Sequence, residues 1–299
     1  MRLHYDIVDV FTDRPFAGNQ LAVVHGGDDL TAEQCLTLAR EFNFSEITFP
    51  SSAVTDGTEY ATRIFTPGGE IPFAGHPTLG TAWVLRSRGL LTSADATQVC
   101  GAGRIGVRFA EGAAGDSVEL SAVPRDLVGP LERPLVNAML SDLGLTVADL
   151  AGEVWAAGAG LTFVHLPVTE EAVVRARPSS RPVSGYAERV GRTQDPIEGL
   201  NLVAVSGEAP SLRVHARVFV PGLLVPEDPA TGSAAAGLGM ALVASGLLPE
   251  GGRYEISQGH EMGRPSTLHG RVTAKAGTTS LCQVSGQVQH VGTGEIAVP

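Results

Sequence analysis

The sequence predicts an α+β fold made of two pseudo-symmetric domains, each a curved, mostly antiparallel sheet wrapped around a central helix. Two observations lead to this prediction. A long segment that begins at Arg63 recurs from Arg217 with its features in the same order. The rest of the chain is rich in strand-like runs and lacks the regular alternation of strands and helices that is typical of a doubly wound fold.

The repeated segment contains three blocks. Both copies begin with Arg-(Ile/Val)-Phe-x-Pro-Gly, both continue with x-Pro-x-x-Gly-(Thr/Ser)-Ala, and both end in Gly-Leu-Leu. The middle blocks start at His76 and Asp228, so the spacing is 228 − 76 = 152 residues, about half the chain. A long-period repeat with two copies indicates two related domains rather than a solenoid. The blocks lie at 63–68, 76–82 and 89–91, and again at 217–222, 228–234 and 246–248.

Each repeat also predicts a long central helix. We expect helices at about 77–88 and 229–245, because Asp228 is a strong N-cap and Pro229 suits the first helical position. Free backbone N–H groups in the first turn of such a helix bind anions. Two equivalent helix N-termini therefore suggest one anion site near a pseudo-twofold axis.

The remaining elements follow from local patterns. Thr31 opens a helix, and Gln34 completes its capping box. The proline-rich stretch 123–134 is the expected boundary, which gives domains 1–122 and 123–299, with the last strand able to return to the first domain. Shorter helices are expected at 137–143, at 169–177 and within 179–192. Strands are expected at 3–11, 21–25, 58–65, 99–109, 117–122, 154–168, 202–205, 212–220, 253–258, 267–276, 279–288 and 294–298.

Composition excludes several classes of protein. The 299 residues are 43% hydrophobic and 18% charged, which indicates a globular protein. A net charge of −11 argues against a nucleic-acid partner. Three distant cysteines, Cys35, Cys100 and Cys282, argue against a disulfide framework and favour a cytoplasmic location. The uncharged run 229–249 is mostly small residues bounded by prolines, so we expect a buried helix and no membrane span.

Three side chains are candidates for chemistry. The repeat makes His76 the counterpart of Asp228, and both lie at a predicted helix start. Glu46 lies in a mostly apolar run, and the similar stretch 160–163 has glycine in its place. A carboxylate at one of two equivalent positions, in an apolar cleft, would have the raised pKa that proton transfer needs.

No cofactor or metal is expected. The segment 101–106 matches G-x-G-x-x-G, but a strand rather than a helix follows it, so a hairpin is the preferred interpretation. The eight histidines show no spacing typical of a metal site.

Five segments of the chain resemble the phenazine-biosynthesis PhzF-like family, which shares the diaminopimelate epimerase fold. The resemblance implies a cofactor-independent isomerase with its site between two similar domains, in which Glu46 moves a proton between carbons of a dihydro-hydroxyanthranilate ring. Gln20 departs from the proline usual after Gly-Asn, at a turn. The segments are FTDRPFAGNQLAVV at 11–24, FNFSEITF at 42–49, RIFTPGGEIPFAGHPTLGTA at 63–82, EDPATGSA at 227–234 and QGHEMGRPS at 258–266.

The same resemblance implies roles for further residues. His76, Asp228 and Ser233 are implied as polar site groups, and Gly75, Gly232 and Ser233 as backbone donors to a substrate carboxylate. Asn19 is implied to order the N-terminal loop, and Ser45 to contact the substrate. A small carboxylated substrate and a homodimer are also expected. Racemases of this fold use two cysteines where this chain has His76 and Asp228, so two-thiolate racemisation is disfavoured.

Three functions remain open from the sequence. The leading one is an isomerase that shifts a proton on a small carboxylated substrate. The first alternative is an amino-acid epimerase or racemase that uses Glu46 with a second base. The second alternative is a non-catalytic member of the fold that binds a small molecule or a protein.

Overall fold

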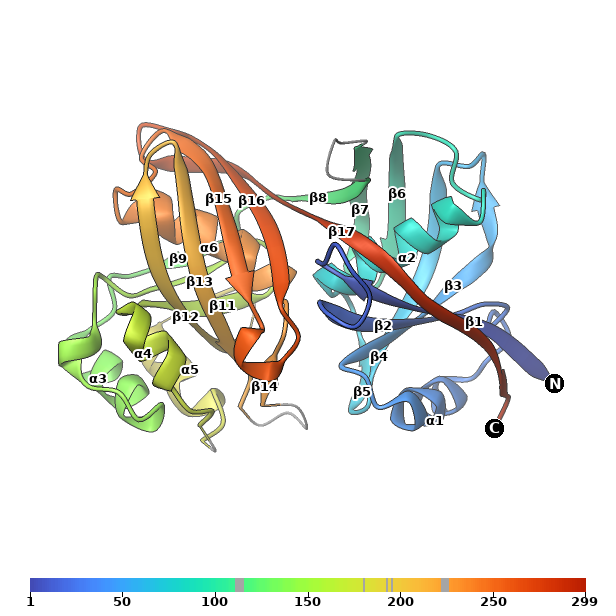
Figure 1. Cartoon of the computed structure of the whole chain (residues 1–299), viewed down its shortest axis with the longest axis horizontal. Helices are drawn as coiled ribbons and strands as arrows, with labels where there is room; N and C mark the ends of the chain where they lie inside the picture. The colour runs from blue at the N-terminus through green and yellow to red at the C-terminus, as the bar shows by residue number, and fades with distance from the viewer. Residues whose placement is uncertain (111–115, 180, 192, 195, 222–225) are drawn as a thin grey trace. The chain divides into compact units, whose positions relative to one another are not determined.

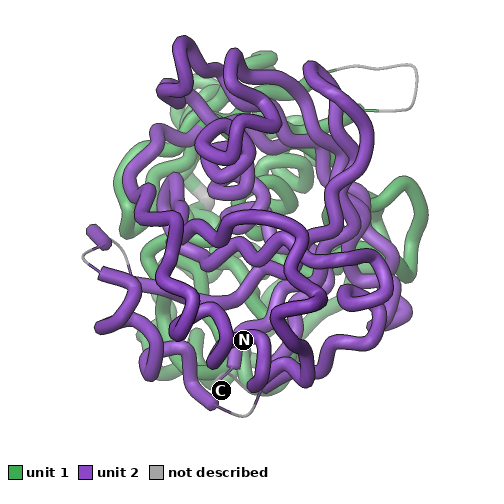
Figure 2. Tube along the Cα trace, turned by 90° about the vertical axis from the view of Figure 1, so that its left-hand side faces the viewer, with its two compact units in different colours: residues 1–121, 285–299 green, residues 122–284 purple. Residues whose placement is uncertain are grey.

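The computed structural model describes residues 1–110, 116–179, 181–191, 193–194, 196–221 and 226–299. The chain forms two compact units, coloured separately in Figure 2: unit 1 comprises Met1–Ser121 and Ser285–Pro299, and unit 2 comprises Ala122–Val284. Both combine sheet with a few helices, as predicted (Figure 1). No helix in the described part of the chain is long and apolar enough to cross a membrane.

Unit 1 is a ring of strands around helix α2. Neighbours pair in the order β1, β2, β3, β4, β6, β7 and β8, and β17 pairs with both β8 and β1. The elements are β1 Arg2–Val10, β2 Asn19–Val24, α1 Ala32–Phe42, β3 Glu46–Thr55, β4 Glu59–Thr66, β5 Gly69–Ile71, α2 Gly75–Ser87, β6 Asp95–Cys100, β7 Gly103–Ala110, β8 Ser117–Ala122 and the part of β17 (Thr278–Ala297) that begins at Ser285.

Unit 2 wraps its strands around helix α6, which packs against β10, β11, β15 and β16. A second apolar layer joins the sheet to α3, α4 and α5. The elements are β9 Asp126–Val128, α3 Arg133–Asp142, η1 Val147–Asp149, β10 Trp155–Gly158, β11 Thr162–Pro167, α4 Glu170–Arg175, α5 Ser184–Val190, β12 Ile197–Glu208, β13 Ser211–Phe219, β14 Glu227–Asp228, α6 Gly232–Ala244, β15 Gly251–Gln258, η2 His260–Met262 and β16 Ser266–Lys275.

Five successive strand pairings have the same directions in both units. In unit 1 the pairings alternate between antiparallel and parallel, beginning and ending with an antiparallel pair, in the order β1–β2, β2–β3, β3–β4, β4–β6 and β6–β7. In unit 2 the pairs β10–β11, β11–β12, β12–β13, β13–β15 and β15–β16 run in the same sequence of directions. The central helix joins the two strands of the second parallel pair in each unit.

The repeated Arg-x-Phe block has the same structural role in both units. Each arginine makes a two-pronged ion pair with a glutamate, a geometry that suits the planar guanidinium, and lies over the phenylalanine two residues further on. The pairs are Arg63–Glu70, with N–O distances of 2.9 and 2.8 Å, over Phe65 at 5.0 Å, and Arg217–Glu227, with distances of 2.8 and 2.9 Å, over Phe219 at 4.8 Å.

Local signals placed most elements but misjudged some ends. Helix α1 has the predicted capping box, with Thr31 and Gln34 bonded to each other. Helix α3 begins at Arg133, four residues before its predicted start, because Pro134 fits the first turn of a helix. The two strands predicted at 279–288 and 294–298 are one strand, β17, because pairing with β1 keeps the intervening residues extended.

Helix α6 is buried almost along its whole length, and glycine lets the sheet approach it. A Cβ on Gly237 would lie 2.5 Å from the Ala157 carbonyl oxygen and 3.0 Å from His165 Nε2. The helix is therefore seated closer to β10 and β11 than any other residue would permit at this position.

We predict that Gly237→Ala lowers the free energy of unfolding by about 1–3 kcal/mol, because overpacking against backbone outweighs the gain in helix propensity. Gly185→Ala is the matched control, since Gly185 is an exposed helical glycine whose Cβ would meet nothing closer than 3.9 Å. The control should raise stability by about 0.4–1 kcal/mol. Chemical denaturation of both variants checks the pair, and an equal effect of the two would contradict the tight seating of α6.

Candidate functional site

Five of the predicted site residues lie together in unit 1. Asn19 is the first residue of β2 and Glu46 is the first residue of β3, and these strands are parallel neighbours. Gly75 and His76 are the first two residues of α2, which packs against both strands. The N-terminus of the central helix therefore meets the beginnings of two strands, with Ser45 just before β3.

Hydrogen bonds fix the orientation of the His76 ring. Ser45 Oγ donates to Asn19 Oδ1 at 3.3 Å, so the amide nitrogen of Asn19 faces His76 Nδ1, also at 3.3 Å. An amide nitrogen only donates, so Nδ1 accepts and the ring proton of neutral His76 lies on Nε2. Nε2 is the atom that faces Glu46 Oε2, at 3.8 Å.

The carboxyl group of Glu46 has an altered acidity and, among the described residues, one unbonded oxygen. Burial raises the pKa of its carboxyl above the ordinary value, and the neighbouring Ser45 hydroxyl only partly opposes that rise. Its Oε2 atom is buried and has no hydrogen-bond partner within the described ranges. The 3.8 Å separation from His76 Nε2 is too long for a hydrogen bond. Glu46 therefore has an oxygen able to accept a proton.

The raised pKa of Glu46 predicts that Glu46→Gln is more stable than the wild type at high pH. The unfolded chain loses the Glu46 proton near pH 4.3, whereas the folded chain keeps this proton to a higher pH. The free energy of unfolding therefore falls as the pH rises from the pKa of the unfolded state to that of the folded state, and it stays at the lower value above this range. Thermal unfolding of both proteins at about pH 4 and about pH 8 checks this. The advantage of Glu46→Gln should grow with pH, and a constant difference would show that Glu46 titrates normally.

The other predicted residues lie together in unit 2. Asp228 ends the two-residue strand β14, and Gly232 and Ser233 are the first residues of α6. Thr231 donates its hydroxyl hydrogen to Asp228 Oδ2 at 2.6 Å. Gln258, at the end of β15, bonds to both Asp228 and Thr231.

The structure corrects the predicted start of this helix. Asp228 is not its N-cap, because α6 begins at Gly232 and Thr231 holds the cap position. Asp228 is kept extended by pairing with Val218, and its carbonyl oxygen accepts from Gln258 instead of from the helix. Helix α6 thus begins later than predicted, whereas helix α2 begins earlier than predicted, at Gly75.

The structure also corrects the predicted counterpart of Glu46. The stretch 160–163 leads into β11, whose place in the order of strand pairings corresponds to β2 rather than β3. Strand β12 corresponds to β3. Ile47 pairs with Phe65, and Leu200 pairs with Phe219, the repeat equivalent of Phe65. Gly199 therefore holds the position that corresponds to Glu46.

Sequence reasoning gave no role to Gln258 or Thr231. Gln258 is part of the family motif QGHEMGRPS, but only the fold brings its side chain to the start of α6. Asn19 was expected to order the N-terminal loop; its side chain bonds to His76 and Ser45, while Asp9 accepts from the backbone N–H of Phe16 in that loop at 2.6 Å.

The Gly-rich segment, the possible metal ligands and the cysteines are weaker candidates for a functional site. Residues 101–102 form the turn between β6 and β7, as the hairpin interpretation predicted. Within the described residues no group of three or more His, Cys, Asp or Glu side chains is arranged to hold a metal ion. Burial raises the pKa of Cys282 to about 12 and also raises that of Cys35, so neither is a reactive thiolate.

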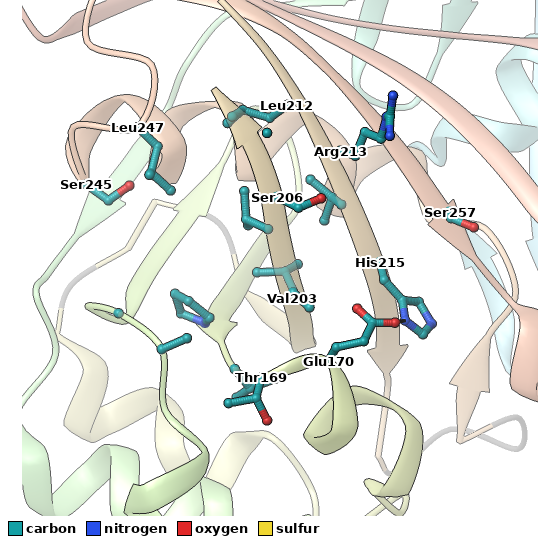
Figure 3. A pocket seen from close by; sticks show the side chains of 18 of the residues that line it. Thr169, Glu170, Val203, Ser206, Leu212, Arg213, His215, Ser245, Leu247 and Ser257 are labelled. Atoms are coloured by element: carbon teal, nitrogen blue, oxygen red, sulfur yellow. Dashed lines mark hydrogen bonds and ion pairs between the residues drawn. The ribbon is translucent and has the colours of Figure 1, made fainter. Parts of the chain in front are cut away.

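A groove of about 970 Å³ lies over β12 and β13 in unit 2 (Figure 3), and none of the predicted site residues lines it. Its His215 ring already contacts carboxylates through both nitrogens, at 2.6 Å from Glu170 and 3.1 Å from Glu261. Both nitrogens of His215 are thus already engaged by side chains of unit 2.

Comparison with known proteins agrees with this fold and with these motifs. Residues 8–294 match the family described as phenazine biosynthesis-like protein. The chain belongs to this family. A trans-2,3-dihydro-3-hydroxyanthranilate isomerase from Pseudomonas aeruginosa is 35% identical over 285 residues, covering 94% of this chain and 95% of the relative. The enzyme with that name from Pseudomonas chlororaphis is 32% identical over 296 residues, covering 99% of each chain.

A solved structure also resembles this member of the phenazine biosynthesis-like family. It is described as a predicted epimerase from Pseudomonas aeruginosa, and it matches with a TM-score of 0.84 at 28% identity, covering 100% of both chains. The prediction of an isomerase of this family is confirmed by these relatives.

Proposed function

We propose that the protein is a cofactor-independent isomerase that moves a proton between two carbons of a small carboxylated substrate, with Glu46 as the acid and base. The observation that carries this proposal is the Glu46 carboxyl, which has a raised pKa and 18% of its side chain exposed, and whose buried Oε2 atom has no hydrogen-bond partner among the described residues and lies 3.8 Å from His76 Nε2. Such a group is not a solvated surface charge, because only 18% of its side chain is exposed.

The substrate class follows from the two helix N-termini. The first N–H groups of α2 and α6 have no acceptor within their own helices, and they suit a carboxylate. Gly75, Gly232 and Ser233 would supply these donors. We propose that the two units are related by duplication and that their groups of site residues face one cleft between them. The names of the isomerase relatives favour a dihydro-hydroxyanthranilate or a similar ring.

In the proposed reaction, ionised Glu46 takes a proton from one carbon of the substrate, and the electron pair left behind spreads over the adjacent double bond. The protonated Glu46 then returns the proton to another carbon on the same face. Burial favours the protonated carboxyl, so Glu46 can hold the proton between the two steps. His76 would donate from Nε2 to developing negative charge, and Asp228 would orient the substrate.

An epimerase that uses two bases is the second candidate, since one related structure is described as a predicted epimerase. Such an enzyme needs a base on each face of the reacting carbon. Gly199 stands in unit 2 where Glu46 stands in unit 1, which argues against a symmetric pair of glutamates. Asp228 would then have to serve as the second base. A homodimer in the cytoplasm, with no metal or other cofactor, completes the proposal.

We predict that Glu46→Gln lowers turnover by about 10²–10⁴-fold, the usual size of a general acid–base contribution, and leaves substrate binding nearly unchanged. Asp228→Asn and His76→Ala should keep more residual activity. The assay follows loss of absorbance of trans-2,3-dihydro-3-hydroxyanthranilate, with binding measured by calorimetry. Wild-type turnover in Glu46→Gln would exclude this mechanism and favour the two-base or the binding-protein alternative.

A second prediction tests the anion site at α6. Ser233→Ala should weaken binding of the substrate carboxylate only modestly, because the backbone N–H remains. Ser233→Pro removes that N–H and should weaken binding more, although proline is itself tolerated in the first turn of a helix. Calorimetry with the substrate, or with a carboxylate analogue, compares the two variants. Equal and negligible effects would place the anion elsewhere.

A further inference from the structure

Gln258 uses all of its hydrogen-bonding groups to hold the turn that leads into α6. Its side chain is buried at the end of β15, with 2% of the residue exposed. Oε1 accepts from the backbone N–H of Thr231 at 3.3 Å. Nε2 donates to the Asp228 carbonyl oxygen at 2.8 Å and to Thr231 Oγ1 at 3.1 Å. One side chain thus bonds to both ends of the four-residue turn.

The direction of these bonds determines the role of Asp228. Thr231 Oγ1 accepts a hydrogen from Gln258, so its own hydrogen points away, toward Asp228 Oδ2 at 2.6 Å. Asp228 Oδ2 is therefore an acceptor. Hydrogen bonds donated to a carboxylate favour its charged form. Gln258 donates a hydrogen bond to Thr231, and Thr231 donates one to Asp228. Both bonds are therefore directed toward Asp228 and favour a negative charge on it.

The backbone next to Gln258 leaves this arrangement little freedom. Gly259 has a φ of +77°, and a Cβ there would lie 2.6 Å from the Pro229 carbonyl oxygen and 2.4 Å from that of Arg264. The end of β15 therefore packs directly against the backbone of the turn, in contact that only glycine permits. Side chain and backbone of the Gln-Gly pair together fix the position of the turn.

Unit 1 contains a similar glutamine, but the hydrogen bonds that start from it lead to a backbone carbonyl oxygen. Gln98 lies in β6, the strand that corresponds to β15, and donates to Thr78 Oγ1 in the first turn of α2 at 2.8 Å. The Thr78 hydroxyl, however, donates to the Ala74 carbonyl oxygen at 2.9 Å and not to a carboxylate. Both glutamines brace a central helix, but only Gln258 acts on a site residue.

We propose that Gln258 is a positioning residue that, through Thr231, holds Asp228 in its charged form and in place for the reaction. The catalytic part of this role rests on the proposed function. The effect on the charge of Asp228, by contrast, is a property of the turn and can be measured without any substrate.

The substrate-free experiment compares four variants by carbon-13 NMR of the Asp228 carboxyl, assigned with Asp228→Asn. In Gln258→Met and Thr231→Val the pH at which Asp228 is half ionised should rise by roughly one unit, because a hydrogen bond to the charged form is lost or weakened. Thr231→Ser keeps the hydroxyl and should restore the wild-type titration. Gln98→Met removes an equivalent buried bond in unit 1 and should leave Asp228 unchanged. An unshifted midpoint in both Gln258→Met and Thr231→Val would overturn the proposal.

Kinetics with trans-2,3-dihydro-3-hydroxyanthranilate test the catalytic part. Gln258→Met and Thr231→Val should lower kcat with little change in KM, and neither should lower kcat further in an Asp228→Asn background, because residues that act as one unit are not additive. Additive losses would assign Gln258 a purely structural role. If the wild type turns over no carboxylated substrate, the proposed function fails, while the NMR titration still decides whether Gln258 sets the charge of Asp228.

Discussion

The burial of a central helix on nearly all sides is the constraint on which each unit depends. Helices α2 and α6 carry small or apolar side chains along most of their length, and both units bend a sheet around them. Within such a core only the helix ends have unsatisfied backbone groups. Polar side chains therefore gather where the N-terminus of the helix meets the strand ends. In unit 1 this is where Asn19, Glu46 and His76 lie.

Bidentate ion pairs with arginine distinguish the carboxylates that stabilise the fold from the carboxyl group of Glu46. Arg63 and Arg217 neutralise Glu70 and Glu227 through two-pronged ion pairs, so these four charges stabilise the fold. Glu46 has no such partner, and burial alone raises its pKa. The two units differ most at this point, because glycine occupies the corresponding position in unit 2. In the proposed mechanism the repeat provides the scaffold, and this difference between its copies provides the reactive group.

Much of the fold and of the site was predictable from the sequence, because the repeat and the family motifs mark the central helices and the residues beside them. Register and hydrogen-bond direction were not. Glu46 was compared with Gly160 because the two stretches look alike, whereas strand pairing assigns the comparison to Gly199. Asp228 was expected to cap α6 because aspartate before proline usually does so. Gln258, 30 residues away in sequence, takes its carbonyl oxygen instead, and no local pattern reveals such a contact.

In the proposed reaction, Glu46 removes a proton from the substrate and returns the same proton. The most direct measurement is a single turnover of trans-2,3-dihydro-3-hydroxyanthranilate that carries deuterium on the carbon that loses its hydrogen, followed by mass spectrometry of the product. Glu46, whose Oε2 atom is buried, should exchange slowly with water and carry part of the deuterium to the accepting carbon on the same face. Complete loss of the label, with solvent hydrogen delivered to the opposite face, would contradict the account and require a second base.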